Sequence, residues 1–439
     1  MLARIQECIL YRGFSDGEIL NNMAELINLY ESDEEALKAK EDQFFKSING
    51  LVELAGMYGF SGNIWHTYLT FLLVNHENAF SMASEIRGAI KGSINDLAKN
   101  DFQIFKELYD FDITVFDRVF GTVCCKVICD YQTPDENSKL FNTRIRDRIC
   151  QMSKTLAAAA TTEEFMDDMV SFYKDFGVGK LGLHKAFRIG HDENGKVEIQ
   201  PITRIAHVKI DDLVGYEIAK KKLIENTEAF VQGRKANNCL LFGDAGTGKS
   251  SSIKGILNQY YDQGLRIIEA YKHQFQDLND VIAQIKNRNY KFILYMDDLS
   301  FEEFEIEYKY LKAVIEGGLE KKPDNVLIYA TSNRRNLVRE RAADKLEIAD
   351  EDDLHSSDTV QEKLSLVYRF GVRIYFGKPD KKQFQEIVRT LAARYGVTMP
   401  EDELLLKANQ WELSHGGLTG RAAQQFIDYI VGTEEEKRK

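Results

Sequence analysis

Apolar side chains in the first 190 residues recur at intervals of three and four positions. Examples are Ile64, Tyr68, Phe71 and Leu72, followed by Phe80, Ala83, Ile86 and Ile90. This spacing places apolar side chains on one face of a helix. The sequence Thr161-x-x-Glu164 has the form of a capping box and predicts the start of a further helix. We therefore predict a mainly helical N-terminal domain over residues 1–190.

The pattern changes near residue 187, where two β-prone runs flank the turn-type sequence Asp-Glu-Asn-Gly at 192–195. We predict a hairpin or linker over residues 191–210. Beyond it, short apolar runs alternate with helical stretches, at 239–242, 265–268, 292–296, 326–330 and 372–376. Strands separated by helices favour a parallel sheet covered on both faces. The predicted architecture is an α/β domain over residues 211–376, followed by a small helical lid over 377–439.

The length and charge of the chain narrow the possible functions. A chain of 439 residues can bury more than one hydrophobic core. Its formal net charge of -12 argues against a protein that coats nucleic acid through a broad basic face. We find no signal-peptide core at the N-terminus and no apolar run of about 18 residues, so we expect a cytoplasmic protein without a membrane partner.

Two groups of residues in the helical half favour structural roles. The six cysteines lack the paired C-x-x-C spacing of zinc sites and are expected to be buried thiols, although Cys125 and Cys129 would share a helical face that allows a metal or redox role. A group of aromatic residues is expected to pack in the core instead of lining a ligand site. These aromatic residues are Tyr58, Phe60, Trp65 and Tyr68.

A phosphate-binding motif follows the first predicted strand of the α/β domain. The sequence fits G-x-x-x-x-G-K-[ST] and leads into a helical run that begins at Ser251. The motif residues are Gly243, Asp244, Ala245, Gly246, Thr247, Gly248, Lys249 and Ser250. Glycines allow backbone N–H groups to turn toward phosphates, and the helix N-terminus adds a positive dipole. This P-loop predicts ATP binding, with Lys249 on the β- and γ-phosphates and Ser250 on Mg²⁺.

A second acidic element lies at the end of the predicted strand 292–296. Asp297 and Asp298 follow this strand directly, as expected of a Walker B element. Asp297 is predicted to hold Mg²⁺ together with Ser250, and Asp298 to orient or deprotonate the attacking water. An acidic pair at a strand end also has a simpler role, which is to cap the next helix.

From Asp211 to its end, the chain resembles the AAA+ ATPases, because several motifs occur in the order of that class. Residues 212–216, Asp-Leu-Val-Gly-Tyr, are similar to the segment that contacts adenine, which implies nucleotide contacts for Val214 and Gly215. Residues 330–334, Ala-Thr-Ser-Asn-Arg, resemble sensor 1, so that Asn333 is implied to position the lytic water.

Two arginines extend the resemblance. Arg369, within 364–371, matches the region of the arginine finger, which implies that it completes the site of a neighbouring subunit in a homo-oligomer. Arg421 follows the sequence Gly-Leu-Thr-Gly and resembles sensor 2, which implies contact with phosphates in its own subunit. Either arginine could instead form an ordinary surface ion pair.

Taken with residues 62–81, the region from the hairpin to the lid resembles an uncharacterised bacterial family of predicted AAA+ ATPases. That resemblance implies the fold and the nucleotide but no substrate. Asp298 stands where the AAA+ pattern usually has glutamate, so its carboxylate reaches less far. Slow water activation, or assistance from Glu302 or Glu303, would follow.

Three functions are compatible with these motifs. The leading hypothesis is an oligomeric ATPase that remodels a protein partner or assembly. A threading unfoldase is less favoured, because residues 270–280 lack an aromatic-apolar-glycine pore loop unless Tyr271 and Phe275 substitute for it. A loader or regulator acting on nucleic acid has only the lysine runs at 220–222 and 381–382 in its favour. The third is a switch that binds ATP with little turnover.

The stretch 339–363 carries an acidic run at 350–353 and two serines at 356–357. We expect an exposed loop and assign it no chemistry. Its position just before Arg369 is compatible with a subunit contact.

Overall fold

The computed structural model describes residues 2–89, 91–133, 143–203, 205–301, 306–316, 322–333 and 366–437. The chain divides into two compact units, Met1–His184 and Lys185–Lys439. The division lies six residues before the predicted boundary at residue 190. The reason is that the strand at 186–191 belongs to the sheet of the second unit.

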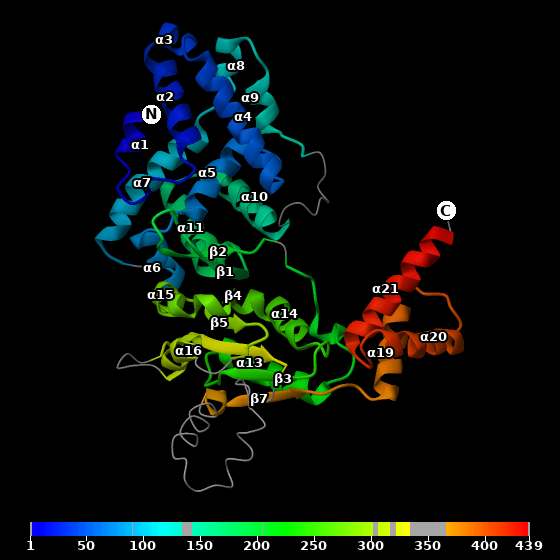
Figure 1. The fold of residues 1–439 in the computed structure, drawn as a ribbon. Coiled ribbons are helices and arrows are strands. Elements are labelled where there is room, and N and C mark those ends of the chain that lie inside the picture. The colour runs from blue at the N-terminus through cyan, green and yellow to red at the C-terminus, as the bar shows by residue number, and fades with distance from the viewer. Residues whose placement is uncertain are drawn as a thin grey trace. The chain divides into compact units, whose positions relative to one another are not determined.

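The described part of the first unit consists of helices joined by loops, as the apolar spacing predicts, with one isolated β-bridge between Gly62 and Tyr131 (Figure 1). Its helices are α1 (Leu2–Gln6), α2 (Glu18–Ser32), α3 (Glu34–Lys38), α4 (Glu41–Tyr58), α5 (Ile64–Asn75), α6 (Ala79–Arg87), α7 (Ser93–Asp110), α8 (Val115–Phe120), α9 (Cys124–Cys129), α10 (Thr143–Ala158), α11 (Thr162–Phe176) and α12 (Gly179–Leu183). The predicted start at Thr161 is observed, since the Thr161 side chain accepts a hydrogen bond from the Glu164 amide at the beginning of α11.

Helix α5 forms the centre of this unit. Nearly all of its residues are buried, which is expected of a helix that is apolar around its whole circumference. Trp65 and Tyr68 on α5 are fully buried, and Trp65 Nε1 donates to the carbonyl of Leu108 on α7. The aromatic group named from the sequence is therefore core, with Tyr58 stacked on Phe60 at its edge.

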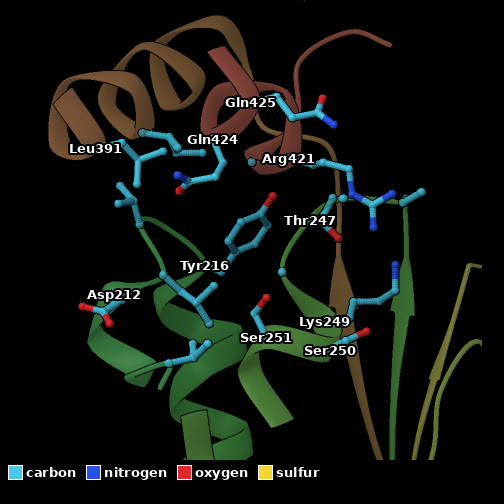
Figure 2. A pocket seen from close by; sticks show the side chains of 18 of the residues that line it. Asp212, Tyr216, Thr247, Lys249, Ser250, Ser251, Leu391, Arg421, Gln424 and Gln425 are labelled. Atoms are coloured by element: carbon cyan, nitrogen blue, oxygen red, sulfur yellow. The ribbon is translucent and has the colours of Figure 1, made fainter. Parts of the chain in front are cut away.

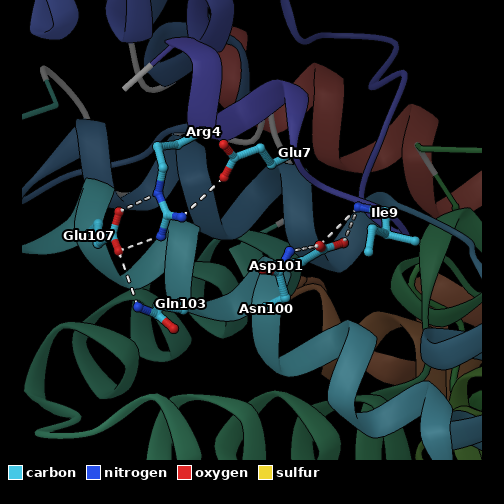
Figure 3. Close-up of polar contacts among 7 residues, drawn as sticks. All are labelled: Arg4, Glu7, Ile9, Asn100, Asp101, Gln103 and Glu107. Carbon is cyan, nitrogen blue, oxygen red and sulfur yellow. Dashed lines mark hydrogen bonds and ion pairs between the residues drawn. The ribbon is translucent and has the colours of Figure 1, made fainter.

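The N-terminal segment is fastened to α7 by a buried carboxylate (Figure 3). Asp101 is fully buried and accepts hydrogen bonds from the backbone amides of Ile9, Leu10 and Tyr11, at 2.7 to 3.0 Å. One turn and a half further along α7, Glu107 pairs with Arg4 at 2.7 Å. A buried carboxylate costs free energy unless donors surround it, and here the chain supplies three backbone N–H groups.

The second unit is built on a seven-stranded sheet of order β2-β1-β4-β5-β6-β3-β7. The strands are β1 (Ala186–His191), β2 (Val197–Pro201), β3 (Cys239–Gly243), β4 (Leu265–Glu269), β5 (Lys291–Met296), β6 (Val326–Ser332) and β7 (Val372–Phe376). All neighbours from β1 to β7 are parallel. The five strands predicted from apolar runs are confirmed, and the second unit has the expected α/β core.

The predicted hairpin is observed, and its first strand begins at Ala186, before the expected bound at residue 191. Strands β1 and β2 do form an antiparallel hairpin, whose turn is held by Asp192 accepting from the amides of Asn194 and Lys196. However, β1 also pairs with β4 over residues 186–188, so that the hairpin extends the main sheet. A β1 edge left unpaired would expose unsatisfied backbone groups, which explains why it joins the sheet.

Helices cover both faces of the sheet, and a helical lid follows it (Figure 1). The α-helices of the core are α13 (Glu217–Val231), α14 (Lys249–Tyr260), α15 (Leu278–Ile285) and α16 (Ile306–Glu316). Short 3₁₀ turns are η1 (Ile210–Asp212), η2 (Tyr261–Gln263) and η3 (Lys272–Asp277). The lid helices α19 (Lys381–Arg394), α20 (Glu401–Ser414) and α21 (Gly420–Lys437) have their own apolar core. Strand β6 is buried at every position, as a doubly covered sheet requires.

Two properties of the described ranges complete the fold. None of their helices has the length and apolar character that a membrane span needs. Within the same ranges, no three His, Cys, Asp or Glu residues cluster in a way that could hold a metal, and all six cysteines are free thiols.

Candidate functional site

A pocket of about 750 Å³ lies at the carboxyl ends of β3, β5 and β6, with the lid on its other side. These three strands are neighbours in the sheet, so the residues that follow them meet although they are far apart in sequence. In open α/β sheets this edge is where ligands bind. Predicted site residues that line the pocket are Val214, Ala245, Gly246, Thr247, Gly248, Lys249, Ser250, Ser251, Asp297, Asp298, Asn333 and Arg421.

The P-loop connects β3 to α14 in a conformation that needs glycine. Gly243 has φ +135°, and a Cβ atom on it would lie 2.1 Å from the carbonyl oxygen of Phe376 on β7. Gly246 has φ +74° and lies against Arg421 of the lid, whose amide donates to the Gly246 carbonyl at 3.2 Å. The loop is thus fixed to the sheet on one side and to the lid on the other.

Lys249 begins α14 and is only 6% exposed. Its ammonium donates to the carbonyls of Gly243 and Asp244, at 2.9 and 2.6 Å, and to Asn333 Oδ1 at 3.0 Å. Burial lowers the pKa of the Lys249 ammonium, while Asp298 and the other nearby carboxylates act in the raising direction. The lysine therefore connects the P-loop with the residue that follows β6.

Three hydroxyl groups converge on one oxygen of Asp297. Ser250, Tyr295 and Thr331 all donate to Asp297 Oδ1, at 2.8, 2.7 and 2.5 Å. Partial burial acts to raise the pKa of Asp297, but the hydrogen bonds from Thr331, Tyr295 and Ser250 outweigh it and the pKa is lowered. The carboxylate stays ionised and is held in one orientation beside Ser250.

Asp298 has a strained backbone, with φ +51°. Thr331 stabilises this conformation, because its hydroxyl oxygen accepts the Asp298 amide at 2.9 Å and its carbonyl accepts the Leu299 amide at 2.7 Å. Asn333 Nδ2 donates to Asp298 Oδ1 at 2.6 Å. Strain of this kind persists where surrounding contacts over-determine it, and it is enriched at functional sites.

The lid and the segment before α13 form the rest of the pocket (Figure 2). Figure 2 shows Lys249, Ser250 and the Arg421 guanidinium on one side, with Asp212 and Leu391 on the opposite side. Thr419 caps α21 by accepting the amide of Ala422, which directs the start of that helix toward the P-loop. The end at the P-loop is therefore strongly polar, with Lys249 and Arg421 beside Asp297 and Asp298, and the other end combines apolar and polar side chains.

Three predicted contact residues do not line the pocket. Gly243 and Asp244 are not among the residues that line it. Asp244 Oδ2 instead accepts a hydrogen bond from the amide of Lys378, at the start of the connection to the lid. Gly215 lies between two lining residues, Val214 and Tyr216, and has φ +80°. Its contribution is to let the chain turn there.

Arg369 also lies outside the pocket of its own chain. Its guanidinium pairs with Glu316 at the end of α16, and the side chain is about one third exposed. An ion pair within the chain is the simpler role considered for Arg369 from the sequence. This ion pair and a role as an arginine finger are compatible if Arg369 changes partner.

Several other predictions meet the structure outside the pocket. Phe275 is buried against Phe301, so it does not substitute for a pore-loop residue, whereas Tyr271 is 48% exposed and donates to Glu269. Lys220 is nearly buried and donates to the carbonyl of Leu213, so it does not belong to an open basic patch. Glu302, Glu303, Arg334 and the stretch 339–363 lie outside the described residues.

The residues present fit a nucleotide with Mg²⁺. The N-terminus of α14 and the Lys249 ammonium face the polar end, as phosphate groups require. A hydroxyl and an ionised carboxylate, Ser250 and Asp297, lie side by side there and supply the oxygen ligands that Mg²⁺ prefers. Leu213, Val214 and Leu391 provide apolar surface at the other end, suited to an aromatic base.

The sequence motifs did not identify several residues that form the walls of the pocket. His207 and Val208 precede η1, and Tyr395 and Gln424 come from the lid. On α19, Ile387, Leu391 and Arg394 line the pocket at spacings of four and three, which puts them on one face of the helix. That spacing was present in the sequence, but it looks the same whether a helix faces a core or a ligand.

A family model described as "Protein of unknown function (DUF815)" matches residues 182–434, more than half of the chain. A curated relative, the replication factor C large subunit of Staphylothermus marinus, is 35% identical over 74 residues, and the match spans 17% of each protein.

Solved structures of RuvB from Thermotoga maritima are also similar. One variant is 17% identical and has a TM-score of 0.35, with 50% of this chain and 64% of that chain covered. The RuvB Holliday junction branch migration motor is 14% identical with a TM-score of 0.32, and covers 50% of this chain and 71% of that one. The chain therefore spans less than two thirds of the first of these structures and a small part of the curated relative.

Proposed function

The chain belongs to the DUF815 family, and from this premise we propose that it is an AAA+ ATPase that binds ATP with Mg²⁺ and hydrolyses it. One observation carries the proposal. A nearly buried P-loop lysine, Lys249, bonds directly to Asn333, which in turn bonds to Asp298, so that three motifs from three strands meet at one point. A glycine-rich turn without function would not require this convergence.

Each residue around the phosphate end has a role in this proposal. The P-loop amides and the α14 N-terminus bind the phosphates. When the phosphates bind, the Lys249 ammonium leaves the carbonyls of Gly243 and Asp244 and contacts the phosphates instead. Arg421 approaches the phosphates from the lid and links their presence to the position of the lid. Ser250 and Asp297 would hold Mg²⁺, which neutralises charge on the phosphate oxygens.

Asp298 and Asn333 are assigned to the attacking water. Asn333 holds Asp298 Oδ1, so the carboxylate has a defined direction before any water arrives. Asp298 accepts the proton of the water, and Asn333 positions the water through its amide. The shorter reach of aspartate compared with glutamate predicts turnover at the slow end for this class of enzyme.

A binding experiment with a matched control tests the proposal. Lys249→Ala removes the buried ammonium, and we expect the Kd for ATP to rise about 100-fold or more, which corresponds to about 2.7 kcal/mol. Lys254→Ala removes the same charge from an exposed position on the same helix and should leave the Kd unchanged. Equal ATP affinities of the wild type and Lys249→Ala would refute the assignment of the site.

We further propose that the active form is a homo-oligomer that remodels a protein partner or assembly. Support comes from the resemblance of Arg369 to an arginine finger, and its position outside the pocket of its own chain is compatible with a role at a neighbour's site. ATPase activity per subunit should fall on dilution, and Arg369→Ala should abolish its concentration dependence. Constant activity over a wide dilution series, also retained in Arg369→Ala, excludes the oligomer. A pull-down with Asp298→Asn, which should retain ATP, would identify the partner.

A role on nucleic acid and a role as a switch are the alternatives. The first loses Lys220 from its original support but keeps the exposed Lys221, Lys222, Lys381 and Lys382, together with the printed name of the replication factor C relative. Hydrolysis that DNA stimulates, and that loses this stimulation steeply with added salt, would favour it. The switch predicts tight ATP binding with no measurable turnover in the wild type.

A further inference from the structure

The segment 206–213 forms one wall of the pocket and lies across the P-loop helix α14. His207, Val208 and Leu213 line the pocket, and Figure 2 shows Asp212 of the same segment on the side opposite Lys249. Since the phosphates belong at the N-terminus of α14, this wall faces the base of a bound nucleotide. No regular strand or helix holds residues 205–209, so their position depends on contacts with neighbouring elements.

Asn258 on α14 supplies such a contact. Its Nδ2 group donates to the carbonyl of Val208 at 2.8 Å and to the carbonyl of Ala206 at 3.3 Å. These two carbonyls flank His207, so one side chain holds the backbone on both sides of a pocket residue. A side chain with two donors on one nitrogen is what this pair of acceptors requires.

The orientation of the Asn258 amide is determined by its neighbours. Its Oδ1 atom accepts a hydrogen bond from the ammonium of Lys185, which can only donate. The carbonyls on the other side can only accept, so a flipped amide would place like groups against each other on both sides. Lys185 therefore directs the donors of Asn258 toward the segment 206–208.

Two glycines, Gly248 just before α14 and Gly255 within it, bring the segment close. Gly255 and Asn258 are three positions apart, which puts them on one face of the helix. A Cβ atom on Gly255 would lie 3.0 Å from the backbone of Ile210, and one on Gly248 would lie 3.1 Å from the Leu213 side chain. The whole segment thus rests on α14, with Asn258 as its polar attachment.

We propose that Asn258 is a positioning residue for base recognition, holding residues 206–208 as the wall against which the purine of the bound nucleotide packs. The inference rests on the proposed ATP site and assigns two separate functions to helix α14. The first turn of α14 binds phosphates, and its third turn positions the wall for the base. A loss at Asn258 consequently affects ligands that carry a base and spares those that do not.

The test compares ATP with inorganic tripolyphosphate, both with Mg²⁺, on three forms of the full chain. Asn258→Ala removes the two donors, and Ala favours the helix. We expect its Kd for ATP to rise about threefold to tenfold. Asn258→Asp sets a carboxylate oxygen against two carbonyls, and its Kd for ATP should rise about tenfold or more. The Kd for tripolyphosphate should change by less than about twofold in both variants, because the P-loop is untouched.

A charge control and a second measurement complete the design. Asn194→Asp makes the same charge change in the exposed β1–β2 turn and should alter neither Kd. Hydrogen–deuterium exchange without nucleotide should become faster at residues 205–209 in both Asn258 variants. Unchanged exchange there, or equal weakening of ATP and tripolyphosphate, overturns the inference. Failure of the wild type to bind ATP in a Lys249-dependent way overturns the proposed function itself, and is a different result.

Discussion

Asp101→Asn replaces a single oxygen atom by an amide nitrogen, and the structure predicts a large loss of stability from this small change. Asp101 is fully buried in the first unit, and its two oxygens accept the backbone amides of Ile9, Leu10 and Tyr11. Figure 3 shows the contact with Ile9. Asparagine has nearly the same shape, so it creates no cavity. The change therefore isolates the carboxylate charge and one acceptor oxygen.

The magnitude follows from the number of donors. Hydrogen bonds to a charged group contribute about 1.5–3 kcal/mol, and neutral ones about 0.5–1.5 kcal/mol. Three backbone donors thus lose roughly 1 kcal/mol each when the acceptor becomes neutral, or about 3 kcal/mol together. The amide nitrogen would also face the Ile9 N–H, donor against donor, which adds to the loss. Against a total stability of about 5–15 kcal/mol, this is a large fraction.

Tryptophan fluorescence during urea unfolding measures this loss. The chain has two tryptophans, and in a Trp411→Phe background the signal comes from Trp65 alone, which is buried in the first unit. Trp65 bonds to the carbonyl of Leu108 on α7, the helix that carries Asp101. Its signal therefore reports the unfolding of the unit concerned.

Glu107→Gln serves as the matched control, because it removes one carboxylate from the same helix and also releases the N-terminal segment. Its ion pair with Arg4 is more than one third exposed on both sides, so the expected loss is only about 0.2–1 kcal/mol. A loss for Asp101→Asn no greater than that for Glu107→Gln would refute the reasoning. It would mean that the burial and the three backbone donors do not contribute as described.

Three further predictions concern the second unit. Tyr295→Phe removes one of the three hydroxyls on Asp297 Oδ1, and a Mg²⁺ titration of ATP binding should show roughly tenfold weaker metal affinity; an unchanged titration would exclude a positioning role for Tyr295. Glu316→Gln releases Arg369 from its ion pair, and ATPase activity per subunit at high protein concentration should be retained or rise. Arg369→Ala should lower this activity by about 10³-fold. An equal loss in both variants would assign Arg369 a role within its own chain. Burial lowers the pKa of Lys322 to about 8, so the unfolded chain binds this proton more tightly than the folded chain. The free energy of unfolding should therefore rise with pH between about 8 and 10.5, and Lys322→Met should remove that part of the rise. Identical pH profiles of the two proteins would contradict this prediction.

The sheet and the phosphate end of the pocket were predictable, because each depends on a local pattern. The strands are apolar runs ended by glycine or by acidic residues, and the P-loop is a contiguous motif with its strand and helix in place. Asp297 and Asn333 follow buried strands, and the parallel topology brings strand ends to the same edge. Each of these predictions needed only neighbours in sequence.

The base end of the pocket depends on contacts between distant segments, which a single sequence does not reveal. Asn258 looks like an exposed polar residue near the end of a helix until residues 206–208 are placed beside it. Strand β1 was predicted as part of a hairpin, but its second partner, β4, lies about 80 residues away. Phe275 was considered as a substitute pore-loop residue, but it is buried against Phe301.

The central claim is that the chain hydrolyses ATP through Asp298, and single-turnover hydrolysis tests it most directly. Wild type and Asp298→Asn are each loaded with ATP and Mg²⁺, and conversion to ADP and phosphate is followed over time. We predict that both bind ATP with similar affinity and that Asp298→Asn is slower by about 10²-fold or more. Wild-type protein that binds ATP without converting it, or Asp298→Asn turning over at the wild-type rate, would contradict a catalytic role for Asp298.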